Sequence, residues 1–346
     1  MPQDRYRVLV VGTGRMGALR AEDLSNDPRV GQVLVAGRSP HRAQDLADRF
    51  GADVLDWDRI ADADADAVVV TPATSVHGEV LAAVLPAGRP VLCEKPIAMT
   101  LSDTQEMIDL AAGHGSDVQV GFQRRFDAGL RAVHERITTG KLGTLYSLRL
   151  LSHDREPNDA AFIGSSGGIF RDLHVHDLDL VAWLTGSPVA SVYATVAVRE
   201  HRQYDVRNRT AAGDVPDGDV AVIHAVTGSG VQVSIHGSRH DPRGHDVRLE
   251  AFGSKDSVTA GLTECTPLLR LDGAAAPPQS PYAGFVDRFR EAFRAEAAAF
   301  VDLIGGGANP CPPQAALESL RAAVACELSV LRGAPVNVTG VATQED

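Results

Sequence analysis

The sequence predicts an α/β protein with an N-terminal Rossmann-type, doubly wound parallel sheet and a C-terminal α+β domain built on a large, mostly antiparallel open sheet. Three observations predict this class. The chain has 346 residues, which suits two domains of about 150 residues each. Its first part alternates short β-branched runs with alanine-rich helical stretches, and its later part carries longer strand-like runs. We expect a first domain over residues 1–122 and a second domain over residues 123–346, whose C-terminal helices can pack back on the first domain.

The elements of the first domain follow from its residue patterns. Because crossovers between parallel strands are right-handed and place helices on both faces, strands that alternate with helices predict a doubly wound sheet. The expected strands are Arg7–Val11, Gln32–Ala36, Ala67–Thr71, Val91–Cys93 and Val118–Val120. The expected helices are Arg15–Leu24, His41–Phe50, His77–Leu85 and Ser102–Ala112.

The second domain shows longer strands and three helices. Thr227–Gly230 is expected to join two of the strands as a hairpin, and Gly186 is placed as the C-cap of a helix. The expected strands are Leu145–Leu151, Val189–Val198, Asp219–Val226 and Val231–Gly237. The expected helices are Leu173–Leu184, Phe285–Ile304 and one from Pro312 to about Val330, with loops at 201–219 and 270–282.

Composition excludes several classes of protein. The chain carries 33 Lys and Arg against 45 Asp and Glu, a net charge of −12, so the basic field that draws proteins onto nucleic acid is missing. No apolar run approaches the roughly 20 residues of a membrane span, and the N-terminus lacks a secretory signal. We expect a cytoplasmic protein with no nucleic-acid or membrane partner. The four cysteines form no Cys-x-x-Cys pair, which disfavours a disulfide framework and a cysteine-rich zinc site.

A nucleotide-binding motif begins the chain. A hydrophobic run leads into Gly12-Thr-Gly-Arg-Met-Gly17, the Gly-x-Gly-x-x-Gly pattern between a strand and a helix. Gly12 permits the tight turn, Gly14 lets the backbone approach a pyrophosphate, and Gly17 allows close packing of helix and strand. The alternative is a glycine-rich turn without ligand. The predicted cofactor-binding residues of this motif are Gly12, Thr13, Gly14, Arg15, Met16 and Gly17.

The end of the second strand favours NADP over NAD. NAD-preferring proteins usually place an acid there for the ribose 2′-hydroxyl, but the sequence reads Val35-Ala-Gly-Arg-Ser39. Arg38 and Ser39 can donate to a 2′-phosphate, with Arg42 as a second cation. The alternative is a solvated arginine stacked on adenine in a protein that uses NAD or both cofactors.

Two further segments carry candidate catalytic groups. Lys95, in Cys93-Glu-Lys-Pro-Ile97, follows a strand at the carboxyl edge where such folds bind ligands. If the later segment is helical from Asp172, then Asp172 and His176 lie one turn apart on one face. An imidazole can exchange a proton with an alcohol, and an ammonium can stabilise alkoxide charge. The alternatives are a surface lysine, an aspartate that caps its own helix, and a buried histidine.

The sequence resembles the Gfo/Idh/MocA oxidoreductase family, and within it the inositol 2-dehydrogenase branch. The resemblance covers nearly the whole chain in order, and the motifs together are far more specific for the family than for the substrate. They are Gly12–Gly17, Thr71-Pro-x-x-x-x-His77, Glu94-Lys-Pro96, Gly121-Phe-Gln-Arg-Arg-Phe-Asp127, Asp172-x-x-x-His176, Asp246–Lys255 and Phe285–Glu296.

The resemblance implies residue roles. Lys95 polarises the reacting hydroxyl, His176 accepts its proton, and Asp172 supports His176 and binds substrate. Arg125 contacts substrate or shapes the cleft. On the cofactor side the resemblance adds Thr71, Pro72, His77, Glu94 and Lys95. It also implies a homodimer or homotetramer formed through the C-terminal sheet.

Departures from the family pattern affect the substrate. His153 and Arg155 replace an arginine and a proline, while Asp154 remains, His245 stands where a tyrosine is common, and His174 replaces a small residue. Three of these changes add histidine near the expected pocket. His174 and His176 would point about 200° apart on a helix, so no metal is expected. The predicted substrate residues are Lys95, Arg125, His153, Asp154, Asp172, His176 and His245.

The expected function is an NAD(P)-dependent dehydrogenase that reversibly oxidises a ring secondary alcohol of a cyclitol or sugar, a small polyol, to a ketone. An anhydrosugar or aminocyclitol dehydrogenase on the same scaffold is the first alternative. A regulatory protein that senses NADP without turnover is the second, although such a protein has no reason to keep Lys95, Asp172 and His176 together.

Overall fold

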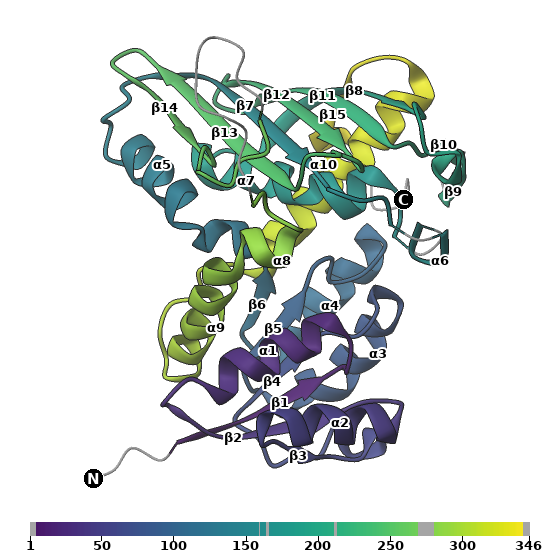
Figure 1. Ribbon diagram of the computed structural model, residues 1–346, viewed down its shortest axis with the longest axis vertical. Coiled ribbons are helices and arrows are strands. Elements are labelled where there is room, and N and C mark those ends of the chain that lie inside the picture. Colours follow the sequence, from purple (N-terminus) through teal and green to yellow (C-terminus); the bar gives the residue numbers. More distant parts are fainter. Residues whose placement is uncertain (1–4, 159, 164–165, 211–212, 269–279, 342–346) are drawn as a thin grey trace. The chain divides into compact units, whose positions relative to one another are not determined.

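The computed structural model describes residues 5–158, 160–163, 166–210, 213–268 and 280–341 (Figure 1). The chain divides into two compact units. The first unit is Met1–Gln123 with Phe293–Leu317, and the second unit is Arg124–Ala292 with Glu318–Asp346.

The first unit contains a six-stranded parallel sheet in the order β3-β2-β1-β4-β5-β6. This is the strand order of a dinucleotide-binding fold, so the predicted doubly wound sheet is confirmed. The two-residue β3 has exposed side chains and no apolar pattern, which is why it escaped prediction. The strands are β1 (Tyr6–Val11), β2 (Val30–Ala36), β3 (Asp53–Val54), β4 (Ala67–Val70), β5 (Val91–Glu94) and β6 (Val118–Gly121). The helices are α1 (Arg15–Ser25), α2 (Pro40–Phe50), α3 (Thr74–Val84) and α4 (Leu101–His114), with 3₁₀ turns η1 (Trp57–Arg59) and η2 (Leu85–Ala87).

The core of the first unit includes a helix from the far end of the chain. Val8 and Val10 of β1 and Val69 of β4 are fully buried, and α9 (Arg290–Ile304) adds Phe300 and other side chains to the same cluster. Fully buried strands appear in a sequence as continuous apolar runs, which explains why β1 and β4 could be predicted.

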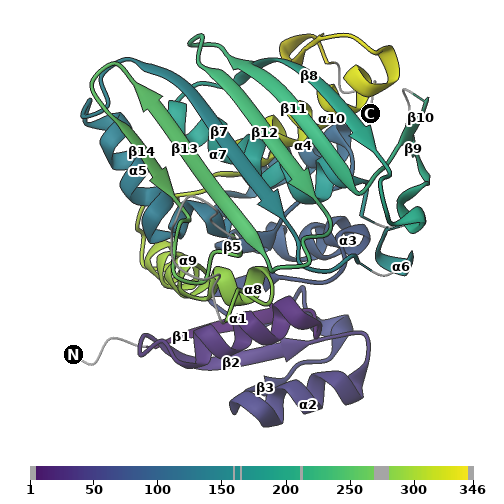
Figure 2. The same ribbon diagram turned by 45° about the horizontal axis from the view of Figure 1, so that its top comes forward.

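The second unit contains a seven-stranded sheet in the order β14-β13-β7-β12-β11-β8-β15 (Figure 2). Its pairs are antiparallel except β7 with β12, so the predicted mostly antiparallel sheet is confirmed. The expected hairpin joins β11 to β12. The strands are β7 (Leu145–His153), β8 (Val189–Ala197), β11 (Val220–Thr227), β12 (Gln232–Ser238), β13 (Asp246–Gly253), β14 (Ser257–Ala260) and β15 (Val336–Asn337).

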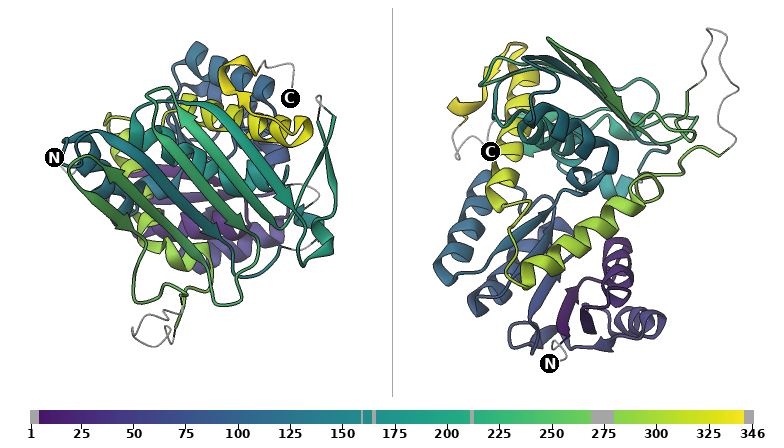
Figure 3. Two further views of the ribbon diagram at one scale, coloured as in Figure 1. Left: turned by 90° about the horizontal axis from the view of Figure 1, so that it is seen from above. Right: turned by 90° about the vertical axis from the view of Figure 1, so that its left-hand side faces the viewer.

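Helices cover one face of this sheet. α7 (Val175–Thr185) packs on β7, β8 and β11, and α5 (Ala128–Thr138) packs on α7. α10 (Pro313–Arg332) ends in the same unit. Figure 3, left, views the sheet from its other face, which no described helix of this unit covers. The short elements are η3 (Gln123–Phe126), α6 (Ala160–Ile163) and η6 (Val338–Gly340).

Three expectations about elements need correction. The stretch 201–219 is not a plain loop: it holds the 3₁₀ turn η5 (Arg202–Tyr204) and a hairpin of β9 (Arg207–Thr210) and β10 (Gly213–Pro216). Its charged residues hide the period of two that marks a strand. The helix expected at Phe285–Ile304 is two helices, α8 (Phe285–Arg288) and α9, because Phe289 is buried with a non-helical backbone.

The third correction concerns the helix expected at Leu173–Leu184. It begins earlier, with a π-helical turn at η4 (Phe170–His174) that continues into α7. Of the expected loop 270–282, residues 270–279 lie outside the described part of the chain. The four cysteines form no disulfide. Within the described ranges, no helix combines the length and apolarity that crossing a lipid bilayer requires.

Candidate active site

The glycine turn between β1 and α1 has the geometry that a pyrophosphate requires. Gly12 has a φ of +117°, and a methyl group there would lie 2.5 Å from Thr71 Oγ1. A methyl group on Gly17 would lie 1.9 Å from the Gly12 carbonyl oxygen, whereas one on Gly14 would meet nothing within 4 Å. Gly14 is the N-cap of α1 and no side chain caps it. The first amides of α1 therefore face open space, and the residues present fit a dinucleotide.

The end of β2 lies beside the same turn. A methyl group on Gly37 would lie 2.6 Å from Thr13 Cγ2, so a larger residue there would have to displace the Thr13 side chain. The Arg38 side chain is 58% exposed, forms an ion pair with Glu79, and stacks over Trp57 at 5.2 Å from the ring centroid. Ser39 caps α2, where its hydroxyl accepts from the Arg42 amide at 3.4 Å. Arg38 and Arg42 both expose their side chains to solvent.

Thr71, Pro72 and His77 connect the loops after β4 and β5. Thr71 Oγ1 donates to the Val11 carbonyl at 3.0 Å, which fixes β4 to the glycine turn. His77 is 1% exposed, and its Nδ1 and Nε2 lie 2.8 Å and 3.1 Å from the carbonyl oxygens of Pro96 and Pro72. Burial lowers the pKa of His77, against these two hydrogen bonds. The His77 ring therefore joins the two loops through these carbonyl oxygens.

Glu94, next to Lys95, belongs to a buried charge cluster that sequence reasoning missed. Arg20 of α1 donates to Glu94 Oε1 from Nε at 2.9 Å and from Nη2 at 2.7 Å. It also donates to Glu296 of α9 at 2.5 Å. Arg20 and Glu296 are fully buried. The cluster fixes the strand end that carries Lys95, whose own side chain is partly buried.

In the second unit, Gly167 and Gly168, both with positive φ, come just before the helical segment that carries Asp172 and His176. Gly168 has a φ of +89°, and a methyl group there would lie 2.5 Å from Asn208 Nδ2. The Ile169 amide donates to Asp217 Oδ1 at 2.9 Å. Asp172 lies within the π turn, at a type of bulge that often marks functional sites, and His176 follows in α7 with 9% exposure.

Asp172 has a partner that no motif indicated. Arg239, just after β12, lies with Nη1 3.3 Å from Asp172 Oδ2. Arg239 is fully buried and its guanidinium stacks over Tyr204, 4.9 Å from the ring centroid. Sequence patterns give no signal for it, because arginine is mostly exposed and only the fold buries this one.

Three predicted substrate residues lie in one polar cluster of the second unit. His153 Nδ1 lies 3.6 Å from Asp241 Oδ2, and His245 Nδ1 lies 3.3 Å from Asp154 Oδ1. The Asp241 amide donates to the Asp154 carbonyl at 2.6 Å. His153 and Asp154 remain about one quarter exposed, whereas His245 is 2% exposed. The first two are therefore the more accessible to a ligand.

Arg125 lies apart from that cluster and pairs with α7. Its Nε and Nη2 donate to the two carboxylate oxygens of Asp179 at 2.9 Å and 2.6 Å. Burial raises the pKa of Asp179, against the attraction of Arg125. This bidentate pair orients α7.

His174 packs against the sheet of the second unit. It is fully buried, with Nδ1 2.8 Å from Asp177 Oδ2, and its Nε2 would lie 2.2 Å from a methyl group on Gly237 of β12. Asp177 also accepts from Arg124 at 2.6 Å and from Ser152 at 2.7 Å. The π turn directs His174 onto the sheet, where only glycine leaves room for its ring.

Comparisons with known proteins agree with this arrangement. Residues 6–122 match the family model of the oxidoreductase family with an NAD-binding Rossmann fold, and residues 130–259 match the GFO/IDH/MocA C-terminal domain. The chain is 34% identical to myo-inositol dehydrogenase Hyg17 of Streptomyces leeuwenhoekii, over 94% of this chain and 98% of that protein. It is 33% identical to inositol 2-dehydrogenase of Rhizobium meliloti, over 88% and 90%.

Solved structures give the same result. A myo-inositol dehydrogenase from Corynebacterium glutamicum superposes with a TM-score of 0.85 at 29% identity, covering 96% of this chain and 98% of that one. GenD2 from gentamicin A biosynthesis, in complex with NAD, superposes with a TM-score of 0.81 at 26% identity, covering 96% of each chain. The glycine turn, the two sheets and both matched domains together show that this chain belongs to the GFO/IDH/MocA family of oxidoreductases.

Proposed function

We propose that this protein is a nicotinamide-dependent dehydrogenase that oxidises a ring secondary alcohol of an inositol-like cyclitol or sugar to the ketone, and reduces the ketone in reverse. The observation that carries the proposal is the position of the Asp172 carboxylate. It lies on the helical segment that also carries His176, and the buried Arg239 holds it there. The polar side chains of His153, Asp154 and Asp241 in the same unit suit a ligand with many hydroxyls. The names of the inositol dehydrogenases to which the chain is similar support the substrate class.

The proposed catalytic groups have different tasks. His176 takes the proton of the reacting hydroxyl on an imidazole nitrogen, and in the reverse direction returns it. Asp172, whose position Arg239 restricts, orients His176 and accepts from a substrate hydroxyl. The Lys95 ammonium stabilises the negative charge that develops on the hydroxyl oxygen. A bound nicotinamide cofactor would supply the hydride acceptor, held at the glycine turn by the amides after Gly14.

Replacement of His176 tests the assignment. His176→Gln should lower kcat by about 10²–10⁴, the usual value of positioned proton transfer, while cofactor affinity measured by fluorescence stays unchanged. His114→Gln, an exposed histidine at the end of α4, is the matched control and should keep full turnover. Full activity of His176→Gln would refute its role as the proton acceptor.

A substrate panel tests the reaction and its main alternative. Initial rates with inositols, aldoses, anhydrosugars and aminocyclitols identify the substrate class. Highest rates with an anhydrosugar or an aminocyclitol would favour the alternative, a dehydrogenase of that class on the same scaffold. Cofactor binding with no absorbance change at 340 nm across the whole panel would contradict the dehydrogenase.

We also propose that NADP is preferred over NAD. The absence of an acid at the end of β2 and the exposed Arg38 support this preference, since Arg38 could exchange Glu79 for a 2′-phosphate. Arg38→Asp should raise KM for NADP selectively. Equal effects on both cofactors, or a lower KM for NAD in the unmodified enzyme, would contradict it.

The uncovered face of the seven-stranded sheet supports a further proposal, that the protein forms a homodimer or homotetramer through this sheet. Outward-facing residues of β8 and β11 include Tyr193, which is 39% exposed. A hollow on this face is lined in part by Arg149, Tyr193, His224 and Val226. An exposed patch of tyrosine and valine is typical of a protein–protein interface.

A further inference from the structure

Three side chains that have not been discussed so far lie together where two strands of the seven-stranded sheet end. Glu200 and His201 follow β8, and His240 follows β12. β8 and β12 both pair antiparallel with β11, so they run in the same direction and their C-terminal ends lie on the same side of the sheet. Val220 of β11 pairs with Ala197 on one side and Ser238 on the other. The fold thus delivers both segments to one place.

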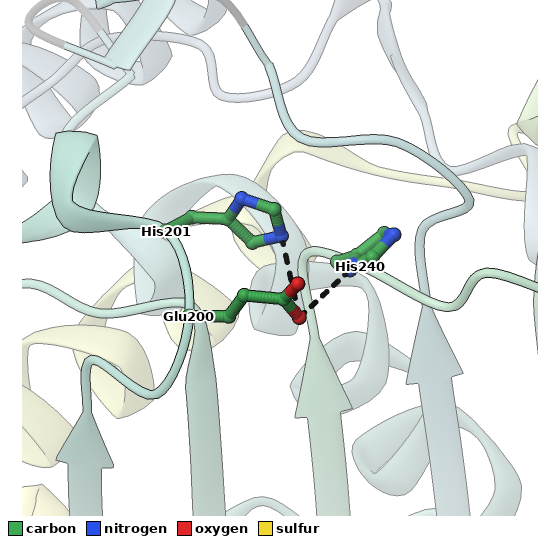
Figure 4. Close-up of side chains that lie close together, drawn as sticks. All are labelled: Glu200, His201 and His240. Atoms are coloured by element: carbon green, nitrogen blue, oxygen red, sulfur yellow. Dashed lines mark ion pairs between the residues drawn. The ribbon is translucent and has the colours of Figure 1, made fainter.

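The three side chains direct their potential ligand atoms at one another (Figure 4). His240 Nδ1 lies 3.4 Å from Glu200 Oε2, and His201 Nε2 lies 3.9 Å from the same oxygen. All three ligand atoms lie within 4.8 Å of each other. The two imidazole rings meet edge to face with centroids 4.6 Å apart. Two nitrogens and one carboxylate oxygen therefore surround a common point.

One of these nitrogens lacks an ordinary hydrogen-bond partner. His201 Nε2 is buried, and no atom of the described residues hydrogen-bonds to it. The Glu200 oxygen that pairs with it lies 3.9 Å away, which is beyond hydrogen-bond distance. Buried polar atoms are nearly always satisfied by protein, water or an ion, so a water molecule or an ion is the expected partner of this nitrogen.

Both segments are fixed before any ion binds. Asp219 accepts from the backbone amides of Arg199, Glu200 and His201 at 2.7, 2.8 and 2.9 Å. At the other segment, Ser238 Oγ donates to the His240 carbonyl at 2.7 Å. Such anchoring reduces the conformational entropy that a bound ion would have to overcome.

The donor set and its spacing suit a divalent transition metal. Zinc binds imidazole nitrogen at about 2.0–2.1 Å and carboxylate oxygen at about 2.0–2.2 Å, which places tetrahedral donors about 3.3 Å apart. The observed separations of 3.4 and 3.9 Å need only small side-chain shifts to reach that value. Nitrogen and carboxylate donors also disfavour magnesium and calcium, which prefer oxygen ligands alone.

We propose that Glu200, His201 and His240 bind one zinc-like divalent ion and leave its fourth position to water. The Glu200 side chain is 70% exposed, which gives the ion a route from solvent. The ion would link the segment after β8 to the segment after β12. This site does not rest on the proposed dehydrogenase function, and its test measures metal binding rather than turnover.

Zinc titration of the chelator-treated, full-length protein tests the site. Calorimetry and metal analysis after desalting should give one Zn²⁺ per chain. Glu200→Gln, His201→Gln and His240→Gln should each weaken Zn²⁺ affinity by at least about tenfold, since even outer-shell changes cost 10-fold to 100-fold. His41→Gln, an exposed histidine of α2 paired with Asp45, is the matched control and should keep the affinity.

A neighbouring group makes the test specific. His153, Asp241 and Asp246 also bring possible ligand atoms within 4.8 Å of one another. His153→Gln should leave Zn²⁺ affinity unchanged. Circular dichroism of each metal-free variant checks the fold, and Glu200→Gln alters only an exposed side chain, so at least one informative variant should fold. Absence of stoichiometric zinc, or loss of zinc in His153→Gln but not in His240→Gln, would overturn the site.

Discussion

Arg20, Glu94 and Glu296 carry a net charge of −1 when all three are ionised, inside the first unit. Burial opposes the charge on Arg20, but attraction to Glu296 and Glu94 outweighs it and holds the pKa of Arg20 above its usual value. Burial raises the pKa of Glu296 from 4.5 to about 7, although Arg20 opposes this change. The Glu94 side chain is 12% exposed and the Glu296 side chain is fully buried. When one of the two carboxylates takes up a proton, we therefore expect it to be Glu296.

This charge imbalance predicts an unusual pH dependence of stability. A carboxyl whose pKa is raised on folding stabilises the protein below its unfolded value, and this contribution is lost as pH rises through the folded value. The contribution of Glu296 should therefore fall between about pH 4.5 and pH 7. Glu296→Gln mimics the protonated form and should remove that dependence. In urea unfolding, the unmodified protein should lose about 1–3 kcal/mol relative to the variant between pH 5 and pH 8.

Glu291→Gln on the same helix gives the control, because Glu291 is exposed. Its unfolding curve should follow that of the unmodified protein at every pH. Parallel pH profiles for the unmodified protein and Glu296→Gln would show that Glu296 stays ionised throughout.

The sequence placed Glu94 beside Lys95 in a family motif but could not reveal the two residues that hold it. Arg20 and Glu296 are separated by 276 positions, and each reads as an ordinary charge on an amphipathic helix. Arg239 was missed for the same reason, since only tertiary packing buries it against Asp172. Sequence motifs therefore identified the candidate site residues but not the residues that hold them in place, because a motif is a local pattern and the supporting residues come from distant parts of the chain.

At the scale of elements, the π turn η4 is fastened to α10 by one buried ion pair. Arg171 Nε and Nη2 donate to the two carboxylate oxygens of Glu327 at 2.8 Å and 2.7 Å. Both side chains are at least 94% buried. Because Asp172 is the next residue, this pair helps to fix the turn that holds the candidate catalytic carboxylate.

Removing one partner of this ion pair should destabilise the protein more than replacing both partners with apolar residues. Arg171→Met leaves the Glu327 carboxylate buried beside an apolar side chain and should destabilise the protein by about 3–5 kcal/mol in urea unfolding. The double variant Arg171→Met with Glu327→Leu should recover much of that loss. Lys141→Ala, which removes an exposed pair with Glu135, should change stability by less than about 1 kcal/mol. A double variant less stable than the sum of the single changes would contradict the argument.

Element prediction succeeded where burial imposes a simple period. Val8–Val11 of β1 and all of β4 are buried and appear as continuous apolar runs. Element prediction failed where a single residue interrupts a helix, as Phe289 does with its non-helical backbone between α8 and α9. The π turn was also missed, since its sequence has the same apolar spacing as the α-helix that it joins.

At the scale of the whole molecule, the sequence predicted the class of both sheets, but it restricts the strand order much more in the first unit than in the second. Alternating strands and helices allow few right-handed arrangements, and the observed β3-β2-β1-β4-β5-β6 is one of them. In the second sheet, β7 pairs with β12 and β13, more than 80 positions later. Hydrophobic periodicity identifies such strands but contains no information about their distant partners.

The two faces of that second sheet lead to a prediction about assembly. Along β8, Val192 and Ala194 face the helices and are buried, whereas Tyr193 faces the other way and is 39% exposed. If this face binds a second copy of the chain, a charge at Tyr193 must be buried in the interface at a cost of several kcal/mol. Tyr193→Arg should therefore reduce the mass measured by light scattering toward the 36.6 kDa of one chain.

Tyr146 provides a control on the same sheet. It is 57% exposed but, two positions before the buried Leu148 of β7, it lies on the face that the helices cover. Tyr146→Arg should leave the assembled mass unchanged. A single-chain mass for the unmodified protein, or equal loss of mass in both variants, would show that the uncovered face does not join copies of the chain.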